Sequence, residues 1–188
     1  PNRLPGSLSE TPTLPFPVPL LDTQWVVLTG QPSSGKSTLL EALAKIGFTT
    51  SKETAREYVY EQMERGLTIQ EIRSDMAHLQ SSILGRSITR ALEADPSQLV
   101  IFDRGIPDSI AYHRHHGLNP EYSRKASEQV RYKKVFMLDA VGFKQDGIRS
   151  ESAEIAQRME DELIKAYSEL GYEIIRVPAV SVEERMNI

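Results

Sequence analysis

The 188-residue sequence contains no cysteine, a single tryptophan and no long apolar run. The absence of cysteine excludes disulfide bonds and thiolate metal sites, and it fits a reducing compartment. No stretch approaches the ~20 apolar residues that a membrane-spanning helix needs. An excess of positive charge is also lacking, because the net charge is −4 at pH 7, which argues against a broad nucleic-acid surface. We therefore expect a soluble, cytoplasmic protein that binds neither nucleic acid nor a membrane.

The remaining composition is that of an ordinary globular domain, with 39% hydrophobic and 26% charged residues,. Residues 1–22 differ from the rest because they hold six prolines. Proline is disfavoured in the interior of a helix and in a central strand, so this segment is predicted to be an extended tail. A docking peptide for a partner is the alternative for the tail. Residues 23–188 are predicted to form one domain, which is long enough to bury a sizeable core.

The most informative stretch follows the apolar run Trp25-Val26-Val27-Leu28-Thr29. It reads Gly30-Gln31-Pro32-Ser33-Ser34-Gly35-Lys36-Ser37, which is the phosphate-binding pattern G-x-x-x-x-G-K-S,. Thr38 opens a good helix-forming segment that ends before Gly47,. A strand, a glycine-bracketed loop and a helix are the context that the pattern requires, so the motif predicts that a nucleoside polyphosphate binds at residues 30–38.

The chemistry of this loop follows from its residue types. Glycines let the backbone wrap closely around a phosphate with its N–H groups pointing inward, and the helix N-terminus adds partial positive charge. Lys36 is predicted to reach the β- and γ-phosphates, and the Ser37 hydroxyl to ligate Mg²⁺. ATP and Mg²⁺ are therefore the expected ligands. A dedicated GTPase is disfavoured, since the sequence has no N-K-x-D guanine motif.

Helical and apolar segments alternate along the rest of the chain. Thr68 and Glu71 form a capping box ahead of an apolar helical pattern that is predicted to continue to Ala94 as one helix,. Apolar strands are predicted at 25–29, 48–51, 98–102, 134–138 and 172–177, and further helices at 38–45, 54–65, 106–116, 121–130, 155–170 and after Ser181. Strands separated by helices indicate an α/β fold in which a five-stranded parallel sheet is covered by helices on both faces.

Charged residues follow several of these strands, and parallel strands bring such residues to one edge of the sheet. Asp103 directly follows a buried strand, where an acid can hold Mg²⁺ or accept a proton from an attacking hydroxyl. Glu53 is a second carboxylate at this edge, and Arg104 could contact a phosphate. Arg149 lies in a polar, glycine-containing loop that could close over the phosphates and stabilise the transferring charge.

Five motifs carry a resemblance to known proteins over residues 25–188. They are G-x-x-x-x-G-K-S at 30–37, Glu53-Thr54-Ala55-Arg56-Glu57-Tyr58-Val59, Phe102-Asp103-Arg104-Gly105, Gln145-Asp146-Gly147-Ile148-Arg149 and Ser181-Val182-Glu183-Glu184-Arg185. With these motifs the chain resembles a family of small P-loop proteins classed as AAA-type ATPases. It is similar in architecture to nucleoside and nucleotide kinases, including the ribosylnicotinamide kinase domain of a bacterial NAD-biosynthesis regulator.

The resemblance implies a three-layer P-loop NTPase fold with the kinase-type strand order 2-3-1-4-5. It also implies a lid that bears Arg149 and an adenine site around residues 178–182. Asp103-Arg104 looks like the Asp-Arg pair of thymidylate kinases, whereas Glu53 looks like the strand-two carboxylate of deoxynucleoside kinases. The two analogies assign the catalytic base differently, so Asp103 and Glu53 both remain candidates.

Two functions from different classes fit these observations. The first is an ATP- and Mg²⁺-dependent phosphotransferase that acts on a nucleoside-like or other small hydroxyl-bearing metabolite. In it Lys36, Asp103, Arg104, Arg149 and Glu53 form the catalytic set, with Ser37 and Asp103 as the metal ligands. The second is an ATP-binding regulatory module with slow hydrolysis and no small-molecule acceptor. A pocket beside Asp103 would distinguish them, because only the phosphotransferase needs one.

Overall fold

The central sheet has five parallel strands. The computed structural model describes residues 21–140 and 150–188. The strands are β2 (Val26–Thr29), β3 (Thr49–Ser51), β4 (Val100–Asp103), β6 (Lys134–Leu138) and β7 (Ile174–Val177), in the order β3-β4-β2-β6-β7. Numbered along the five strands this is 2-3-1-4-5, so the α/β class and the kinase-type P-loop NTPase order are confirmed.

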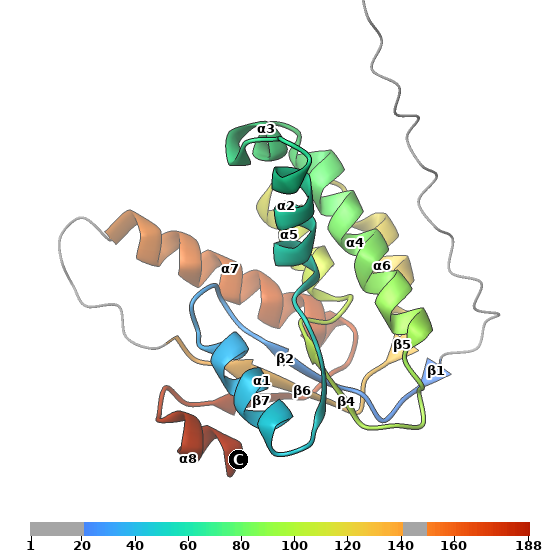
Figure 1. Cartoon of the computed structure of the whole chain (residues 1–188), viewed down its shortest axis with the longest axis vertical. Coiled ribbons are helices and arrows are strands. Elements are labelled where there is room, and N and C mark those ends of the chain that lie inside the picture. Colours follow the sequence, from blue (N-terminus) through green and yellow to red (C-terminus); the bar gives the residue numbers. More distant parts are fainter. Residues whose placement is uncertain (1–20, 141–149) are drawn as a thin grey trace, which may run out of the picture.

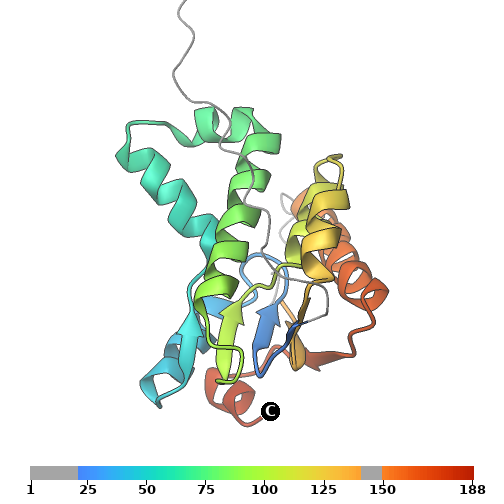
Figure 2. The same cartoon turned by 90° about the vertical axis from the view of Figure 1, so that its right-hand side faces the viewer.

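Helices cover both faces of this sheet, as Figures 1 and 2 show. Because successive side chains of a strand point to opposite faces, neighbouring residues of β2 enter different cores. Val26 and Leu28 pack toward α1 (Lys36–Lys45) and α8 (Val182–Met186). Val27 packs on the other face with residues of α4 (Met76–Glu93) and α7 (Ser150–Glu169). The strands are therefore apolar on both sides, as a sheet between two helical layers requires.

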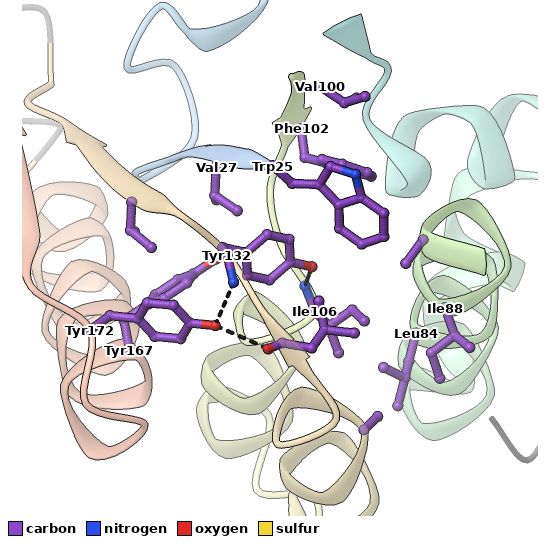
Figure 3. Close-up of a cluster of buried hydrophobic side chains, with 14 residues drawn as sticks. Trp25, Val27, Leu84, Ile88, Val100, Phe102, Ile106, Tyr132, Tyr167 and Tyr172 are labelled. Carbon is purple, nitrogen blue, oxygen red and sulfur yellow. Dashed lines mark hydrogen bonds between the residues drawn. The ribbon is translucent and has the colours of Figure 1, made fainter. Parts of the chain in front are cut away.

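An aromatic cluster fills the core on the α4 and α7 side (Figure 3). The Trp25 and Phe102 rings lie 5.2 Å apart, and Tyr132 packs within 6.3 Å of both. The buried hydroxyl of Tyr132 accepts the Ile106 N–H at 3.1 Å, and the Tyr172 hydroxyl accepts the Tyr132 N–H at 3.1 Å. Buried tyrosines are thus hydrogen-bonded to backbone, and the bond from Ile106 fixes the segment that follows β4 and begins with Arg104.

The helices between β3 and β4 extend beyond the sheet (Figure 1). They are α2 (Thr54–Glu64), α3 (Ile69–Ser74) and α4. The predicted capping box at Thr68 and Glu71 is present, but the single helix predicted over 69–94 is wrong. The helix breaks at Asp75, which has φ −116° and ψ 83° and whose carboxylate caps the N-terminus of α4. An aspartate that can bond to nearby backbone N–H groups favours a cap over a helix interior.

The remaining elements are two helices between β4 and β6 and a small two-stranded sheet. Helices α5 (Asp108–His115) and α6 (Glu121–Ser127) lie between β4 and β6. Strand β5 (Val130–Arg131) pairs in parallel with β1 (Leu21–Asp22), so the last two residues of the segment assigned to the tail join a small sheet. The rest of that segment, 1–20, lies outside the described residues. None of the helices in the described ranges is both long enough and apolar enough to span a membrane.

We expect Asp75→Ala to lower the free energy of unfolding by about 1 kcal/mol, because the substitution removes a helix N-cap. The Asp75 carboxylate accepts the His78 N–H at 2.9 Å. Urea denaturation measures the change. Glu93→Ala, at an exposed position at the other end of α4, is the control and should shift stability by less than about 0.5 kcal/mol. Equal stabilities of the two variants would contradict the capping role.

Candidate active site

The phosphate-binding pattern forms a loop between β2 and α1, in the place that the sequence predicts. Gly30 and Gly35 have φ of 143° and 86°, conformations that side chains with a Cβ rarely adopt. A Cβ on Gly30 would also lie 2.7 Å from the Leu138 carbonyl oxygen, so the loop leaves β2 against the end of β6. Gln31, Pro32, Ser33 and Ser34 complete the turn, and Lys36, Ser37 and Thr38 begin α1.

Lys36 is buried within this loop. Its ammonium donates to the Gly30 carbonyl at 3.1 Å, the Gln31 carbonyl at 3.0 Å and the Ser34 hydroxyl at 3.2 Å. Burial, with the nearby Arg104 charge, lowers the pKa of Lys36 to about 7. A desolvated ammonium ringed by loop oxygens is well placed to hold an anionic phosphate oxygen, which would favour its charged form again.

Asp103, the last residue of β4, is 5% exposed. Within the described ranges its Oδ1 atom has no hydrogen-bond partner. Burial raises the pKa of Asp103 to about 6, and the Glu53 carboxylate adds to this, while Arg104 and Lys36 oppose it. Asp103 borders a cavity of about 470 Å³ between α1 and α2, together with Ser37 and Glu53. The unpartnered Asp103 Oδ1 atom and the Ser37 hydroxyl, which border the same cavity, are oxygen ligands of the kind that Mg²⁺ prefers.

Arg104 has a positive φ of 68° and turns to the opposite face of the sheet from Asp103. Its guanidinium donates to the Gly30 carbonyl and to the Asp108 carboxylate, both at 3.0 Å. The Nε atom lies 3.7 Å from a Glu53 carboxylate oxygen, and the guanidinium lies 5.2 Å from the centroid of the Tyr112 ring. The phosphate loop, β4 and α5 are therefore joined through one side chain.

Asp108 holds Arg104 in place and was not singled out from the sequence. Its carboxylate accepts from the Thr29 hydroxyl at 2.7 Å, the Gly105 N–H at 3.0 Å and the Tyr167 hydroxyl, besides Arg104. The signal for it was an acid in the first turn of a predicted helix, four residues after Arg104. Alone that signal also fits a helix-start charge on the surface, and only the fold buries it.

A second cavity, of about 370 Å³, opens on the Arg104 side of the sheet edge. At one end it is bordered by Glu53, Arg104 and Asp108. Its walls are largely apolar and come from α2, α4 and α5, with Val59, Met76, Leu79, Ile83 and Tyr112 among the lining side chains. Gln80 is the buried amide of this wall, with its Nε2 atom 3.7 Å from the Met76 sulfur. We call this space the acceptor cavity.

The structure thus brings most of the residues predicted for the site to one edge of the sheet. Residues 30–38 form the loop, Glu53 borders both cavities, Asp103 borders one and Arg104 the other. Arg149 lies outside the described residues, so its role stays a prediction. The expected adenine site at residues 178–182 lies after β7 at the same edge.

We expect Asp103→Asn to stabilise the nucleotide-free protein at pH 8 and to leave its stability unchanged at pH 4. A folded-state pKa raised from 3.8 to about 6 means that stability is lost as the pH rises through this interval. The neutral amide avoids that loss, which is on the order of 1–3 kcal/mol. Thermal denaturation of both proteins between pH 4 and pH 8 measures the difference. A variant that is less stable than the parent at pH 8 would show that ionised Asp103 is well solvated or paired.

Comparisons with known proteins agree with this fold. NadR, solved in complex with NR, is 21% identical over 83% of this chain, with a TM-score of 0.57. Deoxyadenosine kinase from M. mycoides, in a structure with bound dCMP, is 17% identical over 87% of this chain and 95% of its own, with a TM-score of 0.59. Thymidylate kinase from Ehrlichia chaffeensis is 16% identical over 87% of this chain and 94% of its own, with a TM-score of 0.56.

These identities show a shared fold, and the match covers only 44% of the NadR chain. A search of curated proteins finds no match. At the level of sequence families, residues 25–185 match AAA_28, described as an AAA domain. Since this match spans most of the chain and contains the nucleotide-binding loop, the protein belongs to the AAA_28 family of P-loop domains.

Proposed function

We propose that the protein is an ATP- and Mg²⁺-dependent phosphotransferase that acts on a hydroxyl group of a nucleoside-like or other small metabolite. The observation that carries this proposal is the acceptor cavity, which begins at Glu53 and Arg104 beside the phosphate loop. A regulatory ATPase needs the loop but no second cavity of this kind. The solved structures with a similar fold include NadR with AMP-PNP and deoxyadenosine kinase with dATP, and they support the proposal that ATP binds here.

The donor side of the reaction is assigned to the loop and to Asp103. Lys36 and the amides at the start of α1 hold the triphosphate. Ser37 and Asp103 suit Mg²⁺, since both border one cavity and Asp103 Oδ1 is buried without a partner among the described residues. When bound, the metal would neutralise negative charge on the phosphates.

Glu53 is the better placed of the two candidate bases, because it borders the acceptor cavity and Asp103 does not. The acceptor hydroxyl oxygen forms a bond to the γ-phosphorus while the bond to the bridging oxygen of the departing ADP breaks. Glu53 receives the hydroxyl proton. Arg104, held 3.0 Å from the Gly30 carbonyl and 3.7 Å from Glu53, supplies positive charge between acceptor and phosphates. Arg149 is proposed to add a further charge.

The acceptor is proposed to arrive without a phosphate of its own. At the inner end of the cavity Arg104 is already paired with Asp108 and lies near Glu53, so its charge is not free for an acceptor phosphate. Arg73 of α3 also lines the cavity and forms no ion pair within residues 21–140 and 150–188. The proposal of an acceptor without a phosphate therefore rests on the pairing of Arg104 alone. Farther out, the Tyr112 ring and the Gln80 amide stand among apolar side chains. An aromatic face and a buried amide suit a flat heterocycle with hydrogen-bonding edges.

A panel of nucleosides and nucleoside monophosphates, incubated with Mg·ATP, tests the proposal. We expect at least one nucleoside to yield a phosphorylated product by chromatography, and monophosphates to react poorly. Gln80→Leu should lower kcat/KM for the best nucleoside about tenfold or more, because it removes a buried hydrogen-bonding partner. ATP turnover that is independent of every acceptor would favour the regulatory ATPase.

Glu53→Gln and Asp103→Asn separate the two carboxylates. We expect Glu53→Gln to retain Mg·ATP binding and to lower kcat about 10²–10⁴-fold, the range for loss of a general base. Asp103→Asn should instead weaken ATP binding in the presence of Mg²⁺ and leave metal-free binding near that of the parent. Calorimetry and initial rates provide both readouts, and the reverse pattern would exchange the two roles.

Lys36→Ala should abolish calorimetric binding of Mg·ATP, because it removes the only side-chain cation that the described phosphate loop itself contains. Lys45→Ala, at the exposed end of α1, is the matched control and should bind normally. Parental affinity in Lys36→Ala would contradict the assignment of the loop.

A further inference from the structure

Arg185, in the C-terminal helix α8, makes contacts that the proposed reaction does not yet use. Its side chain is 5% exposed. The guanidinium donates to three backbone carbonyls: to Pro178 from Nε at 2.9 Å, to Ser34 at 2.7 Å and to Asp139 at 2.9 Å. These carbonyls belong to the segment after β7, the phosphate loop and the segment after β6. One guanidinium thus joins three loops at the edge of the sheet where the candidate site lies.

The contact with Ser34 determines the direction of the next amide. The described chain has no cis peptide bond, and in a planar trans peptide the C=O and the following N–H point in opposite directions. Since the Ser34 carbonyl points at Arg185, the Gly35 N–H points away from α8. Neither Gly35 nor Lys36 donates its amide to an acceptor in residues 21–140 or 150–188, so both amides are available to an anion.

Gly35 does not fix this direction by itself. Its φ is 86°, and glycine can move from this backbone conformation to others at little cost in free energy. Without the Arg185 bond, the Ser34–Gly35 peptide could rotate and turn its carbonyl oxygen toward the phosphates. The guanidinium therefore supplies a constraint that the loop sequence lacks.

The charge of Arg185 acts in the same direction. Among the described residues it forms no ion pair, and its hydrogen-bond partners are neutral carbonyls. The neighbouring acid of α8, Glu184, bonds to Ser181 instead. This buried positive charge is hydrogen-bonded to one side of the phosphate loop. It therefore favours the binding of an anion on the other side of the loop.

We propose that Arg185 is a positioning residue for phosphate binding, which makes the C-terminal helix part of the nucleotide site. It holds the Ser34–Gly35 peptide with its N–H toward the phosphates and contributes its charge through the loop. The proposal rests on the proposed function only in that the loop must bind a polyphosphate. It predicts a loss of affinity for the phosphates themselves, in addition to any effect that the bond to Pro178 has on the expected adenine site.

Calorimetry with Mg·ATP, and displacement of ATP by magnesium tripolyphosphate, test this role in the full chain. We expect Arg185→Met to weaken both ligands about tenfold or more, because a charged hydrogen bond is lost. Any further loss for ATP alone measures the effect of the lost bond to Pro178 on the base. Arg185→Lys, which keeps the charge but not the forked geometry, should lie between Met and the parent. If Arg185→Met does not fold, the Lys and Gln variants provide the same comparison.

Arg131→Met is the matched control. Arg131 also donates to two loop carbonyls, those of Leu170 at 2.7 Å and Gly171 at 2.8 Å, and stacks on Tyr172. These contacts lie before β7, at the N-terminal ends of the strands, whereas the phosphate loop lies at their C-terminal ends. We expect Arg131→Met to lower the melting temperature comparably but to leave both affinities unchanged.

Two results would overturn the role of Arg185. Parental affinity for both ligands in the Arg185 variants would show that the bond to Ser34 does not affect phosphate binding. A loss for ATP without a loss for tripolyphosphate would place the effect at the base. Failure of the parent protein to bind either ligand would instead refute the proposed function, and the proposed role of Arg185 with it.

Discussion

The Arg104 guanidinium joins the phosphate loop to the acceptor cavity through two hydrogen bonds of 3.0 Å, one to the Gly30 carbonyl and one to Asp108. A buried guanidinium is costly unless its donors are satisfied, and Asp108 makes the arrangement tenable because Thr29, Gly105 and Tyr167 hold it in turn. The positive φ of Arg104 adds strain of order 1 kcal/mol or more. The packed core and the partners of Asp108 therefore offset the free-energy cost of the strained backbone and the buried charge at the end of β4.

The alternation of side chains along β4 separates the two halves of the site. Ile101 packs toward α1, whereas Phe102 packs toward α4 and α7. By this alternation Asp103 faces the α1 side with Ser37. Arg104 follows β4, has a positive φ and borders the acceptor cavity formed with α4 and α5. Two adjacent residues thus serve opposite faces of the sheet. Glu53, at the end of the neighbouring edge strand β3, reaches both cavities.

The sequence predicted the features that depend on local pattern. The strand-loop-helix at residues 25–45, the capping box at Thr68 and the helix after Ser181 could be predicted from residue types and spacing, and the structure confirms them. The strand order required the resemblance to known kinases, because periodicity alone does not determine which strands pair. The helix break at Asp75 was missed because apolar spacing continues across it, while a single capping aspartate determines the outcome.

Residues whose role depends on tertiary contacts were also beyond the sequence. Asp108 gains its importance from Thr29 and Tyr167, which lie 79 and 59 positions away. Arg185 contacts Ser34 across 151 positions. Arg185 belongs to the motif Ser181-Val182-Glu183-Glu184-Arg185, but its spacing in the sequence predicts no contact with the phosphate loop. No local pattern encodes such pairs, and a basic residue in a short C-terminal helix is ordinarily a solvent-exposed charge that favours the helix dipole.

The charge balance of the site argues for what must accompany a nucleotide. The carboxylates Glu53, Asp103 and Asp108 lie close to two cations, Lys36 and Arg104. Burial raises the pKa of Asp103, and the neighbouring Glu53 carboxylate raises it further,. A triphosphate adds several more negative charges to this low-dielectric edge, so binding requires additional positive charge. The proposed Mg²⁺ at Ser37 and Asp103, the charge of Arg185 behind the loop and the predicted contribution of Arg149 would provide it.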